Sequence, residues 1–404
     1  MKVLMLGWEF PPFSKGGLGT ACHGIVKGLS NIGVSILLVL PSYEGQSQLD
    51  NVNIVGADKI ANLRVKRVNS LLLPYMTSSE YTVRYKSGGK AHIGIYGSNL
   101  FDEVNRLAAA ASEISKSEHF DVIHAHDWMT FQAGIAAKKA SGKPLVLHVH
   151  ATEFDRSGDN PNPYVYHVER KGLHAADAII AVSEYTKRKI IERYGISPDK
   201  ITVVHNAVEQ RIPSDFNSKL SQHDKIVLFL GRMTLQKGPD YFVYAANMVA
   251  QRIPNVKFIL AGTGDMEPFI IEKAVELGLA DKVLFTGFLT GPDIDRAYKM
   301  ADLYVMPSVS EPFGIAALEA MTNGTPVLIS RQSGVSEVIR HCLKADFWDV
   351  RDIAQKMMSV LEHPELRETM QEEGNKEVRK FSWNDSSKKC QEVYLKVITG
   401  GKIG

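Results

Sequence analysis

Two cations follow the apolar run Ile226–Leu230 at a spacing that suits a diphosphate. Arg232 lies two residues beyond the run, and Lys237 follows five residues later. A guanidinium group can hold two phosphate oxygens at once, and an ammonium group adds a compact positive charge. If a nucleoside diphosphate were the leaving group of a reaction, these cations would stabilise the charge that builds on it. The alternative is a pair of solvated loop cations.

Two glutamates bracket a glycine turn in the otherwise apolar segment Pro307–Met321. Glu311 and Glu319 are eight residues apart, which one solvated helix face does not easily explain. We expect Glu311, in the turn, to meet a sugar ring. We expect Glu319, inside the following helix, to accept hydrogen bonds from a ribose diol. Amides at the start of a helix point at anions, and three of them are expected to face a phosphate: those of Phe313, Gly314 and Ile315.

A glycine-rich loop follows the first apolar run, Val3–Leu6, and precedes a helical pattern. Gly16 and Gly17 lie in this loop, where glycines let backbone amides approach an anion at a helix N-terminus. The loop lacks the G-x-G-x-x-G spacing of dinucleotide-binding proteins. A simple tight turn is the alternative interpretation.

Two histidine pairs end neighbouring apolar runs in the first half of the chain. The motif H-A-H-D ends one run at Asp127, and the motif H-V-H ends the next at His150. Residues i and i+2 of a strand share a face, so the pairs could hold a metal ion, as in metal-dependent hydrolases. They could equally hydrogen-bond sugar hydroxyls through His126, Asp127 and His150. A third interpretation makes His124 and His148, which lie inside their strands, buried core residues.

The elements that must position these residues alternate along almost the whole chain. Short apolar runs separated by amphipathic helical stretches are typical of parallel sheets with helical crossovers. Such sheets bind ligands beyond the carboxyl ends of their strands, near a switch in strand order. Most candidate residues follow such strand ends. Strands are expected at 3–6, 34–40, 121–126, 145–150, 178–183, 201–205, 226–230, 256–261, 283–286, 303–307 and 326–329.

A chain of 404 residues is long enough for two domains. Within the first domain, residues 51–96 change character, and the runs 63–68 and 81–86 alternate apolar and polar side chains, which predicts a small hairpin insertion with one face in water. The segment 209–225 is polar and without apolar periodicity, so we interpret it as the linker. The predicted parts are an N-terminal domain at 1–208, a C-terminal domain at 226–382, and a C-terminal segment at 383–404 with a helix over 386–398.

The composition fits a cytoplasmic protein with reduced thiols. Its three cysteines lie far apart, so they can form neither a disulfide framework nor a four-ligand zinc site. A net charge of +2 gives no reason to expect a nucleic-acid partner. No apolar stretch reaches the ~18 residues of a membrane helix, although the basic run Lys187–Lys189 leaves open a peripheral membrane contact. The oligomeric state is also left open.

No metal ion or other cofactor is expected at the site. Asp293 and Asp295 have the D-x-D form of a manganese site. They lie at a predicted helix start, however, where acidic side chains interact favourably with the helix dipole. No further ligands cluster near them in the sequence.

The second half of the chain resembles the retaining glycosyltransferases of family 4, which have the GT-B fold. Glu311 and Glu319 match the E-x7-E motif of that family, and Arg232 and Lys237 match its diphosphate-binding pair. The resemblance extends over essentially the whole chain. It implies a fold class of α/β type, with two doubly wound Rossmann-like domains that face an interdomain cleft.

The first half adds motifs that are similar to those of glycogen synthases. The run His124–Trp128 is similar to the H-A-H-D-W of bacterial and archaeal glycogen synthases, and His150 matches their active-site histidine. The loop containing Gly16 and Gly17 resembles the N-terminal glycine loop of family 4. The second half departs from glycogen synthases of the neighbouring family 5, because Phe313 stands where those enzymes usually carry a cysteine.

The resemblance implies a role for each candidate residue. His150 would orient the transferred sugar, and the backbone around Phe288 would meet the nucleobase. The C-terminal helix would cross back to the first domain. The implied catalytic residues are His150, Arg232, Lys237 and Glu311. The implied donor-binding residues are Gly16, Gly17, Phe288, Phe313, Gly314, Ile315 and Glu319, and the implied acceptor-binding residues are Glu9, His126 and Asp127.

The implied reaction is transfer of a sugar from a nucleotide sugar to a hydroxyl acceptor, with retention of anomeric configuration and without a metal. The best match is glucose transfer from ADP-glucose or UDP-glucose to an α-1,4-glucan. A lipid, a lipopolysaccharide or a small molecule is the alternative acceptor. From other classes, a metal-dependent hydrolase that uses the histidine pairs, a nucleotide-sugar epimerase and a catalytically silent binding protein remain alternatives.

Overall fold

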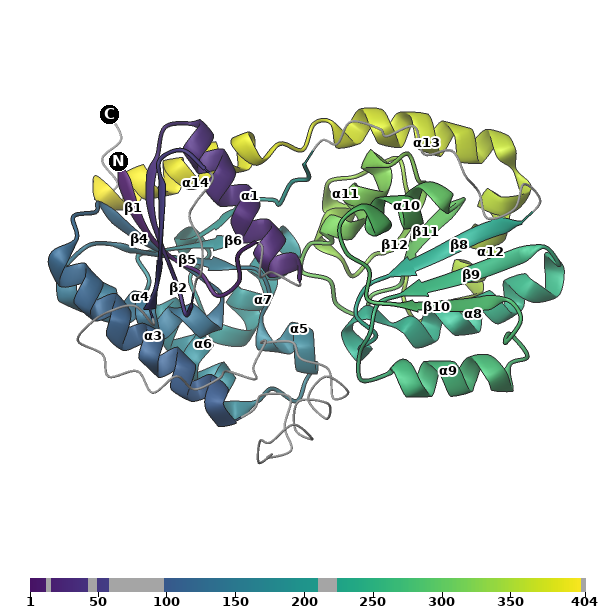
Figure 1. Ribbon diagram of the computed structural model, residues 1–404, viewed down its shortest axis with the longest axis horizontal. Coiled ribbons are helices and arrows are strands. Elements are labelled where there is room, and N and C mark those ends of the chain that lie inside the picture. Colours follow the sequence, from purple (N-terminus) through teal and green to yellow (C-terminus); the bar gives the residue numbers. More distant parts are fainter. Residues whose placement is uncertain (12–15, 43–48, 58–97, 210–223, 401–404) are drawn as a thin grey trace. The chain divides into compact units, whose positions relative to one another are not determined.

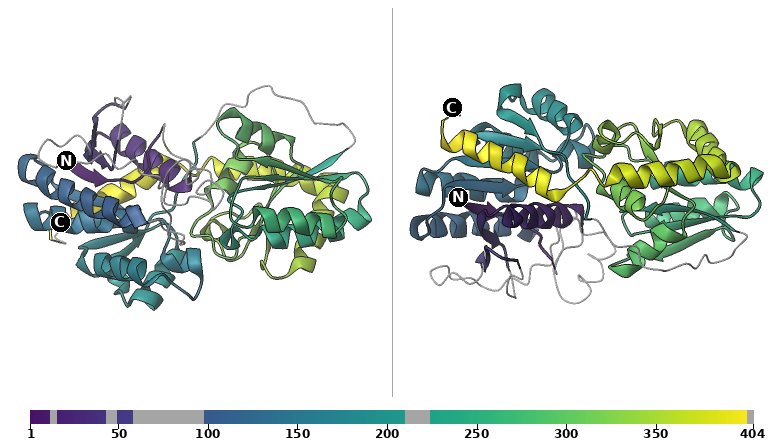
Figure 2. Two further views of the ribbon diagram at one scale, coloured as in Figure 1. Left: turned by 60° about the horizontal axis from the view of Figure 1, so that its bottom comes forward. Right: turned by 90° about the horizontal axis from the view of Figure 1, so that it is seen from above.

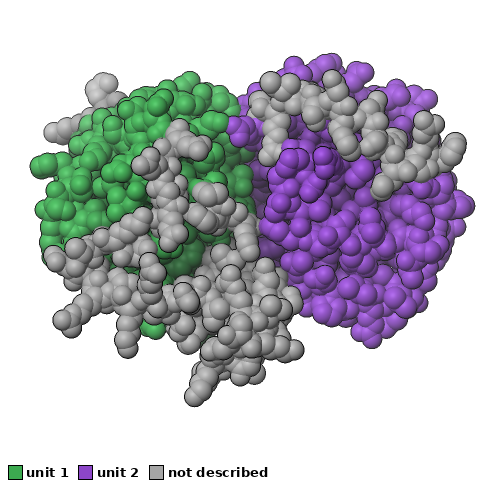
Figure 3. All heavy atoms as spheres, viewed as in Figure 1, with its two compact units in different colours: residues 1–76, 80–207, 382–404 green, residues 77–79, 208–381 purple. Residues whose placement is uncertain are grey.

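The structure is a computed structural model that describes residues 1–11, 16–42, 49–57, 98–209 and 224–400. The two predicted hairpin arms at 63–68 and 81–86 lie outside the described residues, as does most of the predicted linker. The described residues form two compact units (Figure 3). Of the described residues, unit 1 contains 1–11, 16–42, 49–57, 98–207 and 382–400, and unit 2 contains 208–209 and 224–381.

Unit 1 contains a seven-stranded sheet with the order β3-β2-β1-β4-β5-β6-β7. All of its strand pairs are parallel, so the chain must cross over between strands. The order reverses between β1 and β4, which makes this pair the switch point of the sheet. The strands are β1 (Lys2–Leu6), β2 (Ser35–Leu40), β3 (Val52–Gly56), β4 (Val122–His126), β5 (Leu145–Val149), β6 (Ala178–Ala181) and β7 (Ile201–Val203).

The prediction of a hairpin insertion over 51–96 is wrong for its first residues. Strand β3 joins the edge of the main sheet and pairs in parallel with β2, Ile36 opposite Val52. The alternation that predicted the insertion lies at 63–68 and 81–86, outside the described residues. It therefore contained no information about Val52–Gly56, whose short run the hairpin prediction absorbed.

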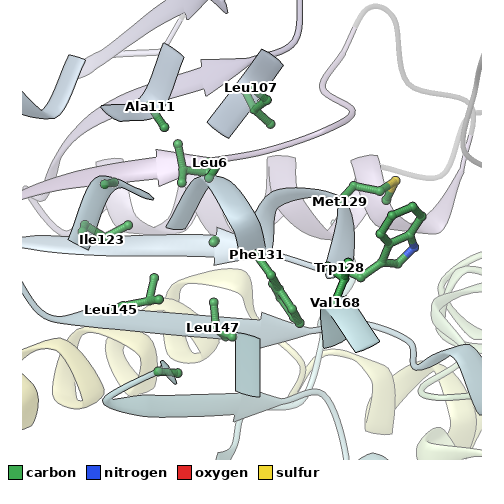
Figure 4. Close-up of a cluster of buried hydrophobic side chains, with 14 of the residues drawn as sticks. Leu6, Leu107, Ala111, Ile123, Trp128, Met129, Phe131, Leu145, Leu147 and Val168 are labelled. Carbon is green, nitrogen blue, oxygen red and sulfur yellow. The ribbon is translucent and has the colours of Figure 1, made fainter. Parts of the chain in front are cut away.

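Helices cover both faces of the unit 1 sheet (Figure 1). On one face, Leu6, Ile123 and Leu147 belong to a buried core that includes Phe131 and Leu107 from the covering helices (Figure 4). Because strand side chains alternate, the residues between them form a second buried core on the other face. The helices are α1 (Gly17–Asn31), α3 (Ser98–Ser117), α4 (Trp128–Ser141), α5 (Glu153–Ser157), α6 (Pro163–Ala175), α7 (Glu184–Tyr194) and α14 (Trp383–Ile398).

The C-terminal helix α14 packs against α1 within unit 1 (Figures 1 and 2). It begins three residues earlier than predicted, because the hydroxyl of Ser382 accepts a hydrogen bond from the Asn384 amide at 3.2 Å. Two glycines of α1 make the close approach possible. A Cβ at Gly24 would lie 2.2 Å from the Trp383 ring, and one at Gly28 would lie 2.3 Å from Ser387 Oγ.

Unit 2 repeats the architecture with a six-stranded sheet of order β10-β9-β8-β11-β12-β13. All its strand pairs are parallel, so the prediction of two doubly wound parallel sheets is confirmed. The order reverses between β8 and β11. The strands are β8 (Lys225–Leu230), β9 (Val256–Ala261), β10 (Val283–Gly287), β11 (Leu303–Met306), β12 (Val327–Ser330) and β13 (Leu343–Ala345), the last of which was not predicted.

Helices α8 and α9 lie on one face of the unit 2 sheet, and α10 and α11 lie on the other (Figure 1). The core under α8 includes Phe242, Phe229 and Phe258. None of the helices in the described part of the chain is both long enough and apolar enough to span a membrane. The helices of unit 2 are α8 (Pro239–Arg252), α9 (Glu267–Glu276), α10 (Pro292–Met300), α11 (Ile315–Thr322), α12 (Val350–Glu362) and α13 (Pro364–Val378).

Candidate functional site

In unit 2, most of the predicted residues gather at the switch point. Arg232 and Lys237 lie in the loop after β8, and Glu311 lies in the loop after β11, the strand beside it. The two loops are tied together by the backbone of Gln236, whose carbonyl accepts hydrogen bonds from the amides of Val309 and Ser310 at 2.9 and 3.4 Å. The strand order therefore brings the two motifs into contact.

Gly238 allows the closest approach between the two loops. A Cβ at this position would lie 2.3 Å from the carbonyl oxygen of Pro307, and its φ is +64°. Any other residue would clash with the backbone of the β11 loop and would also be strained. Glycine here keeps Lys237 close to the β11 loop.

An ion pair joins Lys237 to Glu311 across these loops. Nζ of Lys237 lies 2.5 Å from Oε2 of Glu311, and the hydroxyl of Ser308 donates to the same oxygen at 3.3 Å. The Glu311 side chain is 9 % exposed and that of Lys237 is 22 % exposed, so water screens the pair less than it would a surface ion pair. The lysine is thereby held in place at the edge of the sheet.

The backbone of Glu311 is fixed on both sides. Its amide donates to the carbonyl of Gln332 at 3.0 Å, and its carbonyl accepts from the amide of Gly334 at 2.9 Å. Gly314, three residues on, has φ of +108°, a backbone conformation that suits only glycine. The turn therefore places Glu311 by covalent geometry as well as by hydrogen bonds.

The remaining cation and the second glutamate are partly buried. A terminal nitrogen of the Arg232 guanidinium lies 3.5 Å from the side-chain oxygen of Gln236. Glu319 lies inside α11 and accepts a hydrogen bond from the Tyr298 hydroxyl at 3.4 Å. Tyr298 is itself buried and comes from α10. Both charged groups thus have a polar neighbour that limits their conformations.

The predicted amide cradle and nucleobase position lie at two loops of unit 2. Helix α11 starts at Ile315, and its N-cap residue is Gly314, which offers no side-chain cap. The first amides of a helix have no partner within it, so an anion can bind there. Phe313 is buried, whereas Phe288, directly after β10, is 51 % exposed.

In unit 1, the two histidine pairs form a two-by-two array on one face of the sheet. Strands β4 and β5 pair so that His126 lies opposite His148, and His124 and His150 lie two residues away on the same face. Neighbouring rings of the array are 4.2 to 5.3 Å apart between centroids. All four histidines are buried, and only His150 retains some exposure, at 9 %.

His150 is held by neighbours on β4. Its Nε2 shares a hydrogen bond of 2.9 Å with Nδ1 of His126. Its backbone amide donates to Oδ1 of Asp127 at 2.7 Å. Asp127 adopts φ of +57°, which is uncommon for a residue other than glycine. The buried His126 and Asp127 therefore contact His150 directly.

Burial changes the protonation of this group. Burial lowers the pKa of His150 to about 3 and lowers the pKa values of His126 and His148 well below their usual range, so all three imidazoles are neutral near pH 7. Burial also raises the pKa of Asp127 to about 6, although the nearby Arg156 guanidinium and two backbone amides oppose the rise.

The loop after β1 places the other two predicted elements of unit 1 together. Glu9 is buried, and a Cβ at Gly16 would lie 3.7 Å from its Oε2. Gly17 begins helix α1. The glycine loop and Glu9 are therefore neighbours at the carboxyl end of β1, beside the switch point of this sheet.

Sequence reasoning missed several residues that support the site. Gln236 holds the two loops of unit 2 together, Tyr298 contacts Glu319, and Tyr394 of α14 shares a hydrogen bond of 2.7 Å with Nδ1 of His124. Gln236 could have been identified from the sequence, because it lies between the two candidate cations Arg232 and Lys237. Nothing near Tyr298 or Tyr394 in the sequence indicates which side chain it will meet.

Family models match both halves of the chain. Residues 15–211 match the model described as Glycosyltransferase Family 4, and residues 211–377 match that described as Glycosyl transferases group 1. The chain is 31 % identical to a glycosyltransferase of Methanocaldococcus jannaschii, MJ1607, over 98 % of both chains. A D-inositol 3-phosphate glycosyltransferase of Thermobispora bispora is 29 % identical over 69 % of this chain and 71 % of its own. A glycogen synthase of Mycobacterium tuberculosis is 25 % identical over 98 % of this chain and 94 % of its own.

Solved structures share the fold. Sucrose-phosphate synthase from Thermosynechococcus elongatus superposes with a TM-score of 0.78 at 18 % identity, over 99 % of this chain and all of its own. HepE of Anabaena, in complex with UDP and glucose, gives a TM-score of 0.70 at 20 % identity, over 98 % and 99 % of the two chains.

Two parallel α/β sheets of seven and six strands, as in sucrose-phosphate synthase, show that the chain has the GT-B fold. The chain belongs to glycosyltransferase family 4 and is a retaining glycosyltransferase. The predicted family and fold class are confirmed.

Proposed function

We propose that unit 2 binds the nucleotide-sugar donor and that unit 1 supplies the residues that meet the acceptor. The observation that carries the proposal is the contact between Lys237 and Glu311 at the switch point of unit 2, with Arg232 in the same loop. Ligands of doubly wound sheets bind at this place. Cations and helix-start amides at this place suit a diphosphate, and the carboxylate of Glu311 suits sugar hydroxyls. Together they fit a sugar diphosphate better than a free sugar or a free diphosphate.

The cations would act on the leaving group. As the bond between the anomeric carbon and the phosphate oxygen breaks, negative charge builds on the diphosphate, and Arg232 and Lys237 stabilise it. The first amides of α11 add to this stabilisation. Glu319 accepts hydrogen bonds from the ribose diol, and Glu311 contacts the sugar and fixes Lys237.

The acceptor hydroxyl would attack the face that the diphosphate leaves, which retains the anomeric configuration. A bond forms between the acceptor oxygen and the anomeric carbon, and the hydroxyl proton passes to the leaving phosphate oxygen. This step needs neither a metal nor a covalent intermediate. His150, neutral near pH 7, would orient the transferred sugar through a hydrogen bond rather than through charge.

Glu9 and Asp127 would approach the acceptor from the ends of β1 and β4. His126 has no exposed surface, so we assign its contribution to its hydrogen bond with His150. We place the reaction in the cytoplasm as part of the same proposal, because Cys22, Cys342 and Cys390 are all free thiols.

For the substrates, we propose glucose from UDP-glucose or ADP-glucose and the end of an α-1,4-glucan. The H-A-H-D-W run and the similarity to a glycogen synthase over nearly the whole chain support this acceptor. The similarity to a D-inositol 3-phosphate glycosyltransferase supports a small phosphorylated acceptor as the second candidate.

A transfer assay with matched acceptors separates these candidates. UDP-glucose and ADP-glucose are each incubated with the chain alone, with glycogen, or with inositol 3-phosphate, and nucleotide release is measured. Release that rises with glycogen and yields new α-linked glucose supports the glucan. Release that rises only with inositol 3-phosphate moves the proposal to the second acceptor, and release that depends on neither acceptor contradicts both.

A further inference from the structure

The proposed sugar transfer gives a direct role only to His150 among the four histidines of the array in unit 1. Ring nitrogens of the other three are available for another ligand. One ring nitrogen from each of His124, His126 and His148 lies within 4.8 Å of the others, and all three side chains are completely buried. The register of β4 and β5 produces this grouping, because it puts His126 opposite His148 with His124 on the same face. Two neighbouring parallel strands therefore bring three imidazoles together on one face of the sheet.

Hydrogen bonds to neighbouring side chains occupy some of the ring nitrogens and determine which of them could still bind a ligand. Nδ1 of His124 bonds the hydroxyl of Tyr394, and Nδ1 of His126 bonds Nε2 of His150. When these Nδ1 atoms carry the protons, Nε2 of each ring has a free lone pair that can bind a metal ion. Metal-bound histidines have this arrangement, in which the second ring nitrogen donates to a neighbouring group.

The nitrogens left over have no hydrogen-bond partner among the residues that the structure describes. They are Nε2 of His124, Nε2 of His126, both nitrogens of His148 and Nδ1 of His150. An unsatisfied buried polar atom destabilises the folded state, and such atoms in a folded protein call for an explanation such as an ion or a water. A single ion bound to all three rings would satisfy one nitrogen of each.

We propose that His124, His126 and His148 form a buried site for one divalent transition-metal ion of the zinc type. Three neutral imidazoles suit zinc, cobalt, nickel and copper rather than magnesium or calcium. Ligand nitrogens about 2.0–2.1 Å from a zinc ion are roughly 3.4 Å apart, and each lone pair must point at the ion. His148, which is stacked on His124 and His126 in the structure, would therefore turn out of its present ring plane when the ion binds. A water or small anion would take the fourth position.

The bound ion would have a structural role and a positioning role. It would join β4 to β5 beneath α14, and through Tyr394 it would stabilise the docking of that helix in unit 1. It would also fix the His126 ring so that Nδ1 points at His150. The bond-making step of the proposed sugar transfer uses no metal, so the ion would affect that transfer only through the position of His150.

The test uses the full chain, stripped with a chelator and then titrated with Co²⁺ or Zn²⁺. We expect one equivalent of metal per chain by elemental analysis, the visible absorption of four-coordinate cobalt, and a rise in Tm with added zinc. His148→Gln removes a ligand while keeping a polar side chain, and we expect it to bind cobalt at least tenfold more weakly. His119→Gln changes an exposed histidine in the same unit and should bind cobalt as the wild type does.

Two binding results would overturn the site. One is the absence of both cobalt binding and a zinc-dependent Tm shift in the wild-type chain, and the other is equal binding by folded His148→Gln, as judged by circular dichroism. If His148→Gln does not fold, the wild type decides the question. Anomalous scattering from a zinc-soaked crystal should give a peak among the three rings, and a peak only elsewhere contradicts the proposal.

Discussion

Lys237 and Glu311 are 74 residues apart in the chain, yet their charged groups lie 2.5 Å from each other. The sheet explains the contact, because β8 and β11 are neighbours in space although β9 and β10 separate them in sequence. Each group restrains the other, so the two should act as a unit.

Replacement of Lys237 by alanine should lower kcat/KM by about 10²–10³, as the loss of one electrostatic stabiliser of a transition state does. Lys273→Ala is the matched control, because Lys273 also pairs with a glutamate of unit 2 and is similarly exposed, at 23 %, but lies on α9 rather than in the β8 or β11 loop. Steady-state kinetics of Lys237→Ala, Glu311→Gln and the double variant should show strong non-additivity. Full additivity, or near-normal turnover in Lys237→Ala, would contradict the joint role.

Gly314→Ala should reduce turnover more than it reduces stability. A Cβ at Gly314 would meet Met306 at 3.0 Å and the Glu311 side chain at 3.2 Å, and φ is +108°. Gly278→Ala, at φ of +70° with open space around it, isolates the cost of the backbone conformation, about 1–2 kcal/mol. Urea denaturation should show a loss in both variants, and kinetics should show at least a tenfold loss only in Gly314→Ala. Equal activity in the two variants would mean that the turn does not position Glu311.

The fold could be predicted from the sequence because buried parallel strands are continuous apolar runs. The runs at 145–150 and 256–261 needed no knowledge of their partners. The edge strand β3 was not predicted, because the alternation that suggested an insertion lies at 63–68 and 81–86 rather than in the strand itself. The three-residue strand β13 is too short to show a period.

The candidate site was predictable only where its chemistry lies in one motif. Arg232, Glu311 and Glu319 could be found from local spacing. The contact of Tyr394 with His124 depends on how α14 docks, which follows from glycines in α1 more than 350 residues earlier. Local sequence patterns cannot show how two segments so far apart in the chain pack together.

The docking of α14 on α1 should depend on the absence of a side chain at Gly24. Gly24→Ala places a methyl group 2.2 Å from the Trp383 ring, and overpacking of this kind costs about 1–3 kcal/mol. Hydrogen exchange over residues 383–398 should become faster in this variant. Adding Trp383→Ala should relieve part of the cost, because the two side chains then no longer collide.

Gly374→Ala in α13 is the control for Gly24→Ala, since the nearest atom to its Cβ would lie 3.4 Å away. Alanine favours a helix over glycine by about 1 kcal/mol, so this control should be neutral or slightly stabilising. An unchanged rate of hydrogen exchange over residues 383–398 in Gly24→Ala would show that the docking of α14 does not require glycine at position 24.

The buried histidines should make the chain less stable as the pH falls. Burial and the neighbouring imidazoles lower the pKa of His148 well below its usual range. Below about pH 6.5 the unfolded chain therefore binds a proton that the folded chain does not, and the free energy of unfolding decreases with falling pH. His148→Leu removes this proton, which should flatten the dependence between pH 6 and 4.5 by up to about 1.4 kcal/mol per pH unit.

Urea denaturation at several pH values, with chelator present to remove metal, measures this difference. At pH 7.5 the His148→Leu variant should be as stable as the wild type or more so, because no hydrogen bond is lost. His119→Leu, at an exposed position, should follow the wild type. Parallel curves for His148→Leu and the wild type would contradict a neutral, buried His148.

The most direct test of donor binding is a crystal structure of the chain with UDP or ADP. We predict that the diphosphate lies within hydrogen-bonding distance of the Arg232 guanidinium and of the Lys237 ammonium group, with the ribose at Glu319. A nucleotide bound away from the β8 and β11 loops, or one whose phosphates are held by a divalent ion instead of these cations, would contradict the account.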